Sequence, residues 1–253
     1  MTGNSVFDCK QNNFIQCFVF IPINIFICLL LYSIIFFSIQ KQIKFTKQII
    51  CLLQKIMFFE NLQQFIESEV SNIKNIQIDL QYKWIQSQGV LQLSQKLHQC
   101  LQIIQLQINL QFNQIGKEGL DEIAKAIVGC KLLNQFSINL ESNQIKSEDI
   151  QNFSQCLPLC YNLKNLCLDL ICNEINNEGA LELSTSISQC KNLKSYTLEL
   201  FCNKIDFEGY FSMCKVLQSC NQIYSIRLLL NQKDKKLTQI VKKSKRLVKQ
   251  IQN

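Results

Sequence analysis

Any chemistry in this chain would have to rest on its cysteines and its single histidine. His98 is the only histidine among 253 residues, so a site with several histidine ligands is excluded within one chain. A histidine-based catalytic triad would depend on this one side chain. His98 follows a segment with helical spacing, and a surface position at a helix end is the simplest interpretation. The sequence therefore favours no histidine-based site.

The fourteen cysteines invite a metal site, but their spacing argues against one. Tetrahedral zinc sites use paired C-x-x-C ligands, and the densest group here lacks that spacing. Its members are Cys156, Cys160, Cys167 and Cys172. Cys172 and Cys202 are thirty residues apart and are expected to stack on one another. We expect no metal ion and no cofactor.

Five cysteines, one of them Cys160 of that group, recur at thirty-residue intervals. Identical small residues at one interval indicate a buried repeat position, where a free cysteine behaves as a small hydrophobic residue. An odd number of equivalent thiols is poorly suited to disulfide pairing, which favours reduced thiols in the cytosol. This cysteine column is Cys100, Cys130, Cys160, Cys190 and Cys220.

Motifs for phosphate chemistry are also missing from the sequence. No glycine-rich phosphate loop occurs. The stretch DFEG, Asp206 to Gly209, is similar to a kinase D-F-G, but no kinase glycine loop or catalytic-loop motif accompanies it. It falls instead on a frame that returns along the chain. We therefore expect a protein that is not an enzyme.

That frame, L-x-L-x-L-x-x-N-x-I-x-x-x-G, returns at thirty-residue steps and predicts the architecture. Alternating apolar residues place one face of a strand in the core, and Leu120, Ile123 and Ile127 then follow at helical spacing. A strand-helix unit of this length buries both apolar faces only when it stacks on a copy of itself. Six strands are predicted, centred on Ile76-Ile78-Leu80, Leu106-Ile108-Leu110, Phe136-Ile138-Leu140, Leu166-Leu168-Leu170, Tyr196-Leu198-Leu200 and Ile226-Leu228-Leu230.

The repeat resembles the leucine-rich repeat family, specifically its ribonuclease-inhibitor-like type with a helix in each unit. The L-x-x-L-x-L pattern is cleanest at Leu163, Leu166 and Leu168. The isoleucine that follows each repeat asparagine and the cysteine column match as well, as do the repeat glycines Gly119, Gly179 and Gly209. The resemblance covers about residues 73–230. It implies an α/β solenoid, a horseshoe arc, in which the repeat asparagines form a structural ladder: Asn113, Asn143, Asn173 and Asn203.

The sequence departs from the family pattern in three places. Each unit carries an extra apolar position before its asparagine, so the repeat period is slightly longer than that of most leucine-rich repeats. The first unit has Lys83 where the asparagine belongs, with Trp84 beside it, and the last has Lys233 there and Lys235 after it. Degenerate terminal units are typical of capping repeats.

The side chains between the triplet residues should look outward from the concave strand face. They form a polar to acidic column and a second column that becomes apolar toward the C-terminal units. We expect a partner-binding surface here, although unselected surface residues would give the same exposure. The candidate residues are Asp79, Asn109, Asn139, Glu141, Asp169, Ile171, Glu199 and Phe201.

An apolar block from Phe14 to Ile39 predicts a transmembrane helix, because no charge occurs between Lys10 and Lys41. At the helical rise it spans about 39 Å, enough for a hydrocarbon core of roughly 30 Å. The lysines that follow it place the C-terminal side in the cytosol. A dispensable or incorrectly translated leader is the alternative, and it would leave a soluble cytoplasmic protein. The stretch Ile49–Phe59 is too short to cross again and is expected at the interface or in a helical cap.

The C-terminal segment carries the whole excess of positive charge. From Asn231 onward there are eight Lys or Arg and one Asp, and the other residues hold eighteen of each sign. An apolar stripe predicts a basic amphipathic helix over 231–253. It would either cap the last repeat or contact anionic lipid or an acidic partner. Nucleic acid is the least favoured partner, since no aromatic residue is present for base stacking.

Together these features predict five segments. They are an N-terminal tail (1–13), a transmembrane helix (14–39), a juxtamembrane segment with a helical cap (40–72), the repeats (73–230) and the basic helix (231–253). The expected function is non-catalytic protein binding or scaffolding, inferred from architecture and resemblance. Relatives in the family also regulate enzymes in trans, as GTPase activators or enzyme inhibitors, so the resemblance leaves that role open. The partner is a protein whose identity the sequence does not give.

Overall fold

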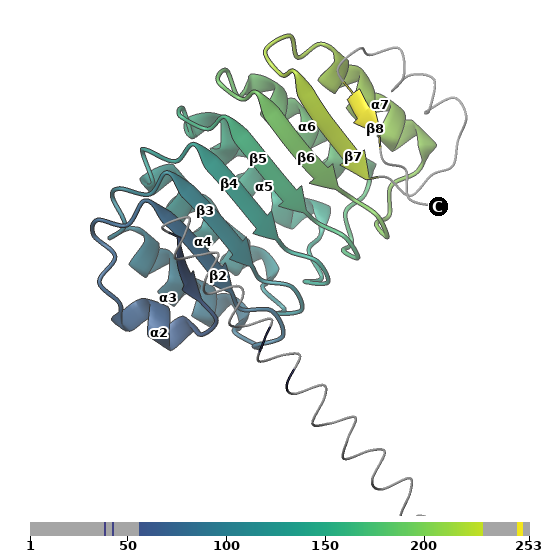
Figure 1. Ribbon diagram of the computed structural model, residues 1–253. Helices are drawn as coiled ribbons and strands as arrows, with labels where there is room; N and C mark the ends of the chain where they lie inside the picture. Colours follow the sequence, from purple (N-terminus) through teal and green to yellow (C-terminus); the bar gives the residue numbers. More distant parts are fainter. Residues whose placement is uncertain (1–37, 39–41, 43–55, 230–246, 250–253) are drawn as a thin grey trace, which may run out of the picture. The chain divides into compact units, whose positions relative to one another are not determined.

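One parallel sheet with helices along one of its faces makes up the repeat region (Figure 1). The computed structural model describes residues 38, 42, 56–229 and 247–249. The chain divides into two compact units, Met1–Leu53 and Gln54–Asn253, and the sheet belongs to the second. Its strands are β1 (Met57–Phe59), β2 (Asn75–Asp79), β3 (Gln105–Asn109), β4 (Gln135–Asn139), β5 (Asn165–Asp169), β6 (Ser195–Glu199), β7 (Ser225–Leu229) and β8 (Leu247–Lys249).

The strands lie side by side in the order of the chain, and the six predicted strands are confirmed as β2 to β7. Neighbouring strands pair at equivalent residues, as Leu106 does with Phe136 and Phe136 with Leu166. Alternation with period two turns Leu106 and Ile108 into the core and leaves the residues between them on the opposite face. The thirty-residue period is therefore the register of the sheet.

A helix returns the chain from each of the strands β2 to β6 to the next, as the spacing predicted. In α4 the residues Leu120, Ile123 and Ile127 are buried against the sheet. Each helix packs on its neighbour in the next unit. The helices are α2 (Leu62–Glu67), α3 (Gln86–Leu97), α4 (Gly116–Gly129), α5 (Ser147–Cys156), α6 (Asn177–Gln189) and α7 (Phe207–Gln218), with a 3-10 turn η2 (Leu157–Leu159) after α5.

Local sequence fixes where these helices begin and end. The Asn176 side chain accepts hydrogen bonds from the backbone N–H groups of Glu178 and Gly179, which caps α6. Asp206 caps α7 in the same way through the N–H of Gly209. Acidic residues in the first turns, such as Glu178, also complement the helix dipole. The helices end at or just before the cysteine column, where burial raises the pKa of Cys130 to about 11 and that of Cys190 to about 12.

The N-terminal end of the sheet differs from the prediction for Ile49–Phe59. Of this stretch the structure describes residues 56–59, and Met57–Phe59 forms not a helix but β1, which pairs in parallel with β2 from Met57↔Ile76 onward. Asn61 then caps α2, and the rings of Phe59 and Phe65 meet edge to face at 5.0 Å. A short strand-helix unit thus precedes Ile73 and covers the first full repeat, because the edge of β2 would otherwise expose unpaired backbone groups.

The C-terminal end also differs from the prediction of one helix over 231–253. Leu247–Lys249 forms β8, which pairs in parallel with β7. An added strand satisfies the backbone groups along the edge of β7, which a helix at these residues would leave open. The rest of the predicted basic helix lies outside the described residues.

The predicted transmembrane helix, 14–39, lies outside the described residues except for Ser38. Within the part of the chain that the structure describes, no helix has the length and apolar character needed to cross a membrane.

The repeat asparagines link successive units where each strand turns toward its helix. Asn143 is fully buried, and its Oδ1 accepts hydrogen bonds from the backbone N–H groups of Asn113 and Ile115 in the preceding unit, at 3.1 and 3.3 Å. Its Nδ2 donates to the carbonyl oxygen of Leu110 at 2.9 Å. Asn113, Asn173 and Asn203 make equivalent bonds one unit apart. Each side-chain amide thus provides hydrogen-bond partners for backbone N–H and C=O groups that are not paired within a strand or a helix.

The first prediction concerns this ladder. Asn143→Ala removes the acceptor of two backbone N–H groups that have no access to water. An orphaned buried donor costs roughly 1–3 kcal/mol, so we expect the free energy of unfolding to fall by about 3 kcal/mol. Urea denaturation followed by circular dichroism measures it. Asn152→Ala, an exposed position on α5, should change the free energy of unfolding by less than about 0.5 kcal/mol. Equal losses in the two variants would contradict the ladder's role.

Candidate protein-binding face

The sheet face opposite the helices, here called the open face, carries all eight predicted partner-binding residues. They lie at or just beyond the C-terminal ends of β2 to β6, and each is half-buried. The stacking of units places these eight residues, together with Gln81 and Gln111, in two adjacent columns. The first is Asp79, Asn109, Asn139, Asp169 and Glu199, and the second is Gln81, Gln111, Glu141, Ile171 and Phe201.

Most of the first column has a structural task that the sequence did not reveal. Asn139 Oδ1 accepts a hydrogen bond from the backbone N–H of Glu141 at 2.8 Å, which holds the turn as the strand ends. Asn109 and Asp169 make the same bond to residues 111 and 171. Asp and Asn favour such turns because their short side chains reach the backbone two residues on. The Asp/Asn pattern of this column therefore follows from the turn and does not need a partner.

Three carboxylates with raised pKa gather over β4 to β6, and partial burial is the main cause for each. Burial is the main cause of the raised pKa of Glu141, and the charge of Asp169 adds to it. Burial likewise raises the pKa of Asp169, against the lowering effect of the Ile171 N–H bond. Burial and then Asp169 raise the pKa of Glu199, which Arg227 partly offsets. This part of the open face is therefore acidic, and its charges are incompletely neutralised.

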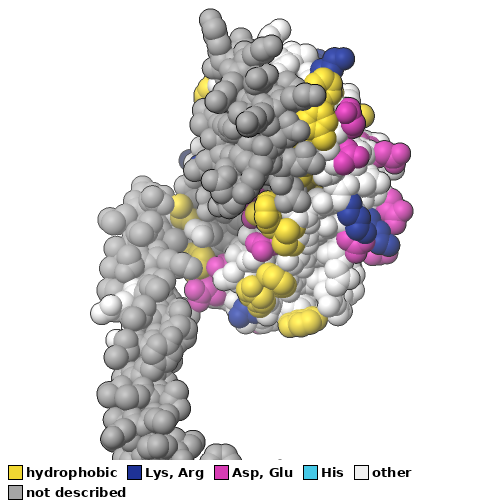
Figure 2. Space-filling view, turned by 90° about the vertical axis from the view of Figure 1, so that its right-hand side faces the viewer, with side chains coloured by type: hydrophobic (Ala, Val, Ile, Leu, Met, Phe, Trp, Pro, Cys, Tyr) yellow, Lys and Arg dark blue, Asp and Glu magenta, His cyan; other side chains and the backbone are white. Residues whose placement is uncertain are grey.

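The second column supplies apolar surface beside these carboxylates. Ile171 and Phe201 are half-buried, so part of each side chain remains accessible, and they follow Asp169 and Glu199 by two residues. Toward the N-terminal units the same column is polar, and Gln111 Nε2 donates to Glu141 Oε2 at 2.6 Å. Apolar area rimmed by polar and charged groups is the usual composition of a protein interface. Figure 2 views the molecule from the right-hand side of Figure 1 and shows separate hydrophobic side chains among uncharged ones, with Lys, Arg, Asp and Glu side chains also present.

The sequence pattern did not reveal a group of aromatic side chains in the turns that follow β2 and β3. The rings of Tyr82 and Phe112 stack with centroids 4.6 Å apart and planes 13° apart, and both are exposed. Trp84, two residues from Tyr82, is 67% exposed. All three have positive φ, near 55°, because the turn needs a left-handed residue at these positions. The thirty-residue spacing of Tyr82 and Phe112 is the signal that could have identified the pair.

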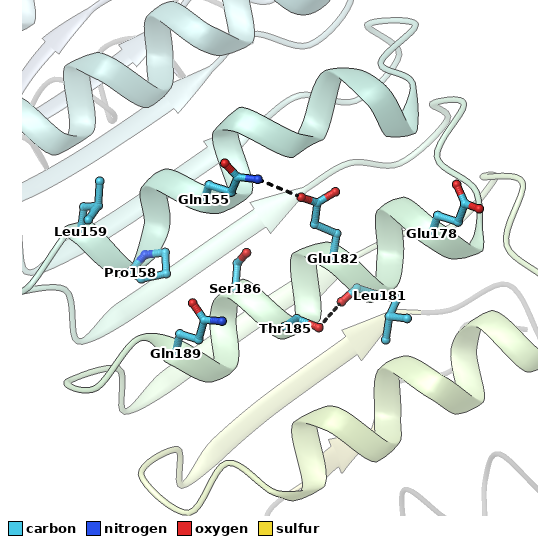
Figure 3. Close-up of a pocket in the computed structure, with 9 residues that line it drawn as sticks. All are labelled: Gln155, Pro158, Leu159, Glu178, Leu181, Glu182, Thr185, Ser186 and Gln189. Carbon is cyan, nitrogen blue, oxygen red and sulfur yellow. Dashed lines mark hydrogen bonds between the residues drawn. The ribbon is translucent and has the colours of Figure 1, made fainter.

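The helix side carries a groove of about 670 Å³ between α5–η2 and α6 (Figure 3). Pro158 ends α5 early, so the short 3-10 turn η2 occupies the place of the last helical turn found in α4 and α6. Leu159 and Leu181 give the groove apolar walls, and Gln155 Nε2 donates to Glu182 Oε1 at 3.4 Å across it. Its lining combines these apolar side chains with polar and acidic ones, so the groove offers a mixed binding surface. The proline within a helical segment was the available sequence signal.

The residues that the sequence singled out for chemistry do not converge. His98 lies exposed at the end of α3, with Nδ1 2.7 Å from the carbonyl oxygen of Ser94. Cys156 and Cys160 lie at the helix end, Cys167 on β5 and Cys172 in the following turn. Among the described residues, no three His, Cys, Asp or Glu side chains come together in a group suited to a metal ion.

Comparison with known proteins agrees with the repeat architecture. The family model described as "Leucine Rich repeat" matches residues 106–124 and 166–184, which are the β3–α4 and β5–α6 units. No curated protein matches the sequence. Among solved structures, "Leiomodin-1 Actin-Binding Site 2 (ABS2)" is similar, with a TM-score of 0.50 and 12% identity. The match covers 63% of this chain and 87% of that one, and at this identity it speaks for the fold alone.

The second prediction tests the acidic cluster. A carboxyl whose pKa is raised on folding opposes folding once ionised, so this penalty is absent below the unfolded pKa and complete above the folded one. Asp169→Asn removes the charge and keeps the acceptor, as Asn109 and Asn139 do in the same column. We expect the free energy of unfolding at pH 7 to rise by up to about 1 kcal/mol. The free energy of unfolding should also decline less steeply as the pH rises through the raised pKa of Asp169.

Urea denaturation at several pH values measures both effects. Glu69→Gln, at an exposed position outside the cluster, is the matched control and should leave the pH dependence unchanged. A loss of stability at pH 7 in Asp169→Asn would show that this carboxylate stabilises the fold.

Proposed function

We propose that this chain, whose two matched repeats support a leucine-rich repeat family, is a non-enzymatic protein-binding module that uses its open face. The observation that carries the proposal is the pairing of accessible apolar side chains, Ile171 and Phe201, with the acidic cluster of Glu141, Asp169 and Glu199. Each strand adds one residue to each column, so a partner would meet a broad, rigid surface. Such surfaces are how repeat proteins bind.

The subtype is part of the proposal. Units of thirty residues, each with a helix of ten or more residues between α3 and α7, favour the ribonuclease-inhibitor-like type. Members of that type are also known as regulators of other enzymes, and regulation in trans would use the same face. Faster hydrolysis by a small GTPase in the presence of the chain would favour regulation, whereas binding without a change in rate would favour a scaffold.

The third prediction tests which face binds. Partners captured by the full chain from a cell extract are compared with those captured by Glu199→Lys/Phe201→Ala, which reverses one charge and removes the largest apolar side chain of the open face. We expect specific partners to bind this variant at least about tenfold less, as hot-spot truncation does. The matched control on the helix side is Glu178→Lys/Leu181→Ala in α6, which should retain them.

The reverse outcome, with partners lost only from the α6 variant, would move the binding site to the groove in Figure 3 and refute the open-face proposal. Purified actin is a defined first probe, because the similar solved structure is described as an actin-binding site of leiomodin-1. The fold likeness does not by itself carry that partner to this chain.

We also propose that residues 14–39 tether the module to a membrane with the repeats in the cytosol. Support comes from the uncharged apolar block between Lys10 and Lys41 and from the lysines that follow it. Anionic lipid contact by the basic residues after 231 would add to the attachment, at about 1 kcal/mol for each basic residue near the surface.

The fourth prediction is that the full chain stays in the membrane pellet after alkaline carbonate extraction, with a C-terminal tag open to protease. Deletion of residues 1–40 should release it to the supernatant at physiological salt. Release of the full chain by carbonate would rule out the transmembrane segment. Retention of the deleted chain at low salt only would assign the attachment to the basic tail.

A further inference from the structure

Two exposed cysteines occupy the same turn position in adjacent units. Cys172 follows β5 and Cys202 follows β6, each two residues after the last residue of the buried triplet and one before the ladder asparagine. Both have positive φ, 53° and 55°, the conformation that this turn imposes on Tyr82, Phe112 and Ser142 in the earlier units. The two thiols are therefore presented alike, one unit apart.

Hydrogen bonds on both sides of the two cysteines fix their spacing. The backbone N–H of Leu170 donates to Glu199, and that of Cys172 donates to Phe201, each at 2.9 Å, so the sheet register continues past the strands. Beyond the turn, the Asn203 side chain holds the N–H of Ile175 at 3.0 Å. Neighbouring strands lie about 4.8 Å apart, within the range of about 4.4–6.8 Å that disulfide-bonded Cα atoms span.

The two side chains also interact. The Cys172 pKa is raised, first by burial and then by a side-chain hydrogen bond with Cys202 and by the charge of that neighbour, whereas a bond with Ser142 acts in the opposite direction. The two thiols therefore lie within reach of one another.

The remaining cysteines of the described residues are less accessible, because each is buried or half-buried. Those of the cysteine column sit behind the sheet, and burial raises the pKa of Cys100, Cys160 and Cys190 to about 12. Thiols that remain protonated and inaccessible do not react as nucleophiles at neutral pH. Cys167 is half-buried, and it lies within β5 on the open face, whereas Cys172 lies in the turn after that strand. Cys172 and Cys202 alone among the described cysteines are exposed.

We propose that Cys172 and Cys202 form a dithiol site that small disulfide oxidants convert into a bond between the two units. The thiolate of one cysteine attacks a sulfur of oxidised glutathione and releases one glutathione thiolate. The second cysteine, once deprotonated, attacks the mixed disulfide and releases the other. Two protein thiols are oxidised and one glutathione disulfide is reduced to two glutathione thiols, which take up the two protons that the protein thiols lose. The proposal is independent of which partner the open face binds.

The fifth prediction is that oxidised glutathione joins Cys172 to Cys202 in the purified, native full chain. Cleavage at Lys164, Lys191, Lys194 and Lys204 releases them in separate peptides, 165–191 and 195–204. Mass spectrometry should find these peptides linked, with a mass two hydrogen atoms below their sum. The link should form at least about tenfold faster than any modification of Cys190.

Three variants make the result specific. Cys172→Ser and Cys202→Ser should each abolish the link and leave the surviving thiol with one bound glutathione. Cys167→Ser, which alters the same 165–191 peptide, should leave the link intact. Separate glutathione adducts on both cysteines of the native chain, or no reaction at either, would overturn the proposal. So would a link that persists in Cys172→Ser, because it would then come from Cys167 or Cys190.

Discussion

The hydrogen bonds of the buried asparagines are the constraint on which the rest of this structure depends. Each amide lies where a strand turns toward its helix, a region in which buried backbone N–H groups find their hydrogen-bond acceptor in the next unit. Asn143 bonds backbone groups of the preceding unit, and Asn173 bonds Asn143's own N–H. Since each link spans two units, an inserted or deleted residue between strand and asparagine would leave several buried groups unsatisfied. The period is therefore held while surface residues vary.

Because the register is fixed, the chemistry of the surface is set by columns of equivalent residues from successive units. Equivalent residues lie one strand spacing apart, so like residues at one position become neighbours in space. The charge of Asp169 consequently adds to burial in raising the pKa of Glu141 and of Glu199, and the rings of Tyr82 and Phe112 stack. Cys172 meets Cys202 for the same reason. The acidic cluster, the aromatic pair and the dithiol are thus three outcomes of one geometric rule.

The interior of the repeat array was predictable because it obeys local periodicity. The described residues of the triplets, from Ile76 to Leu228, matched strands, and the helix stripe of Leu120, Ile123 and Ile127 is buried as its spacing indicated. The ends were not predictable in this way. Met57–Phe59 and Leu247–Lys249 are too short to show periodicity, and they become strands because the sheet edges beside them offer backbone partners. Pairing with a distant segment has no signature in a short stretch of sequence.

By itself, the sequence determined the unit length, the strand-helix alternation, the buried cysteine column and the absence of familiar catalytic motifs, because all of these follow from which residues recur and how far apart. Only the tertiary structure decided what the recurring surface residues do. It assigned Asn139 and Asp169 to turns, placed Ile171 and Phe201 beside carboxylates, and opened a groove beside Pro158. These outcomes depend on side chains thirty or more residues apart meeting in space, and a linear pattern records the spacing of residues but not which polar atom satisfies which.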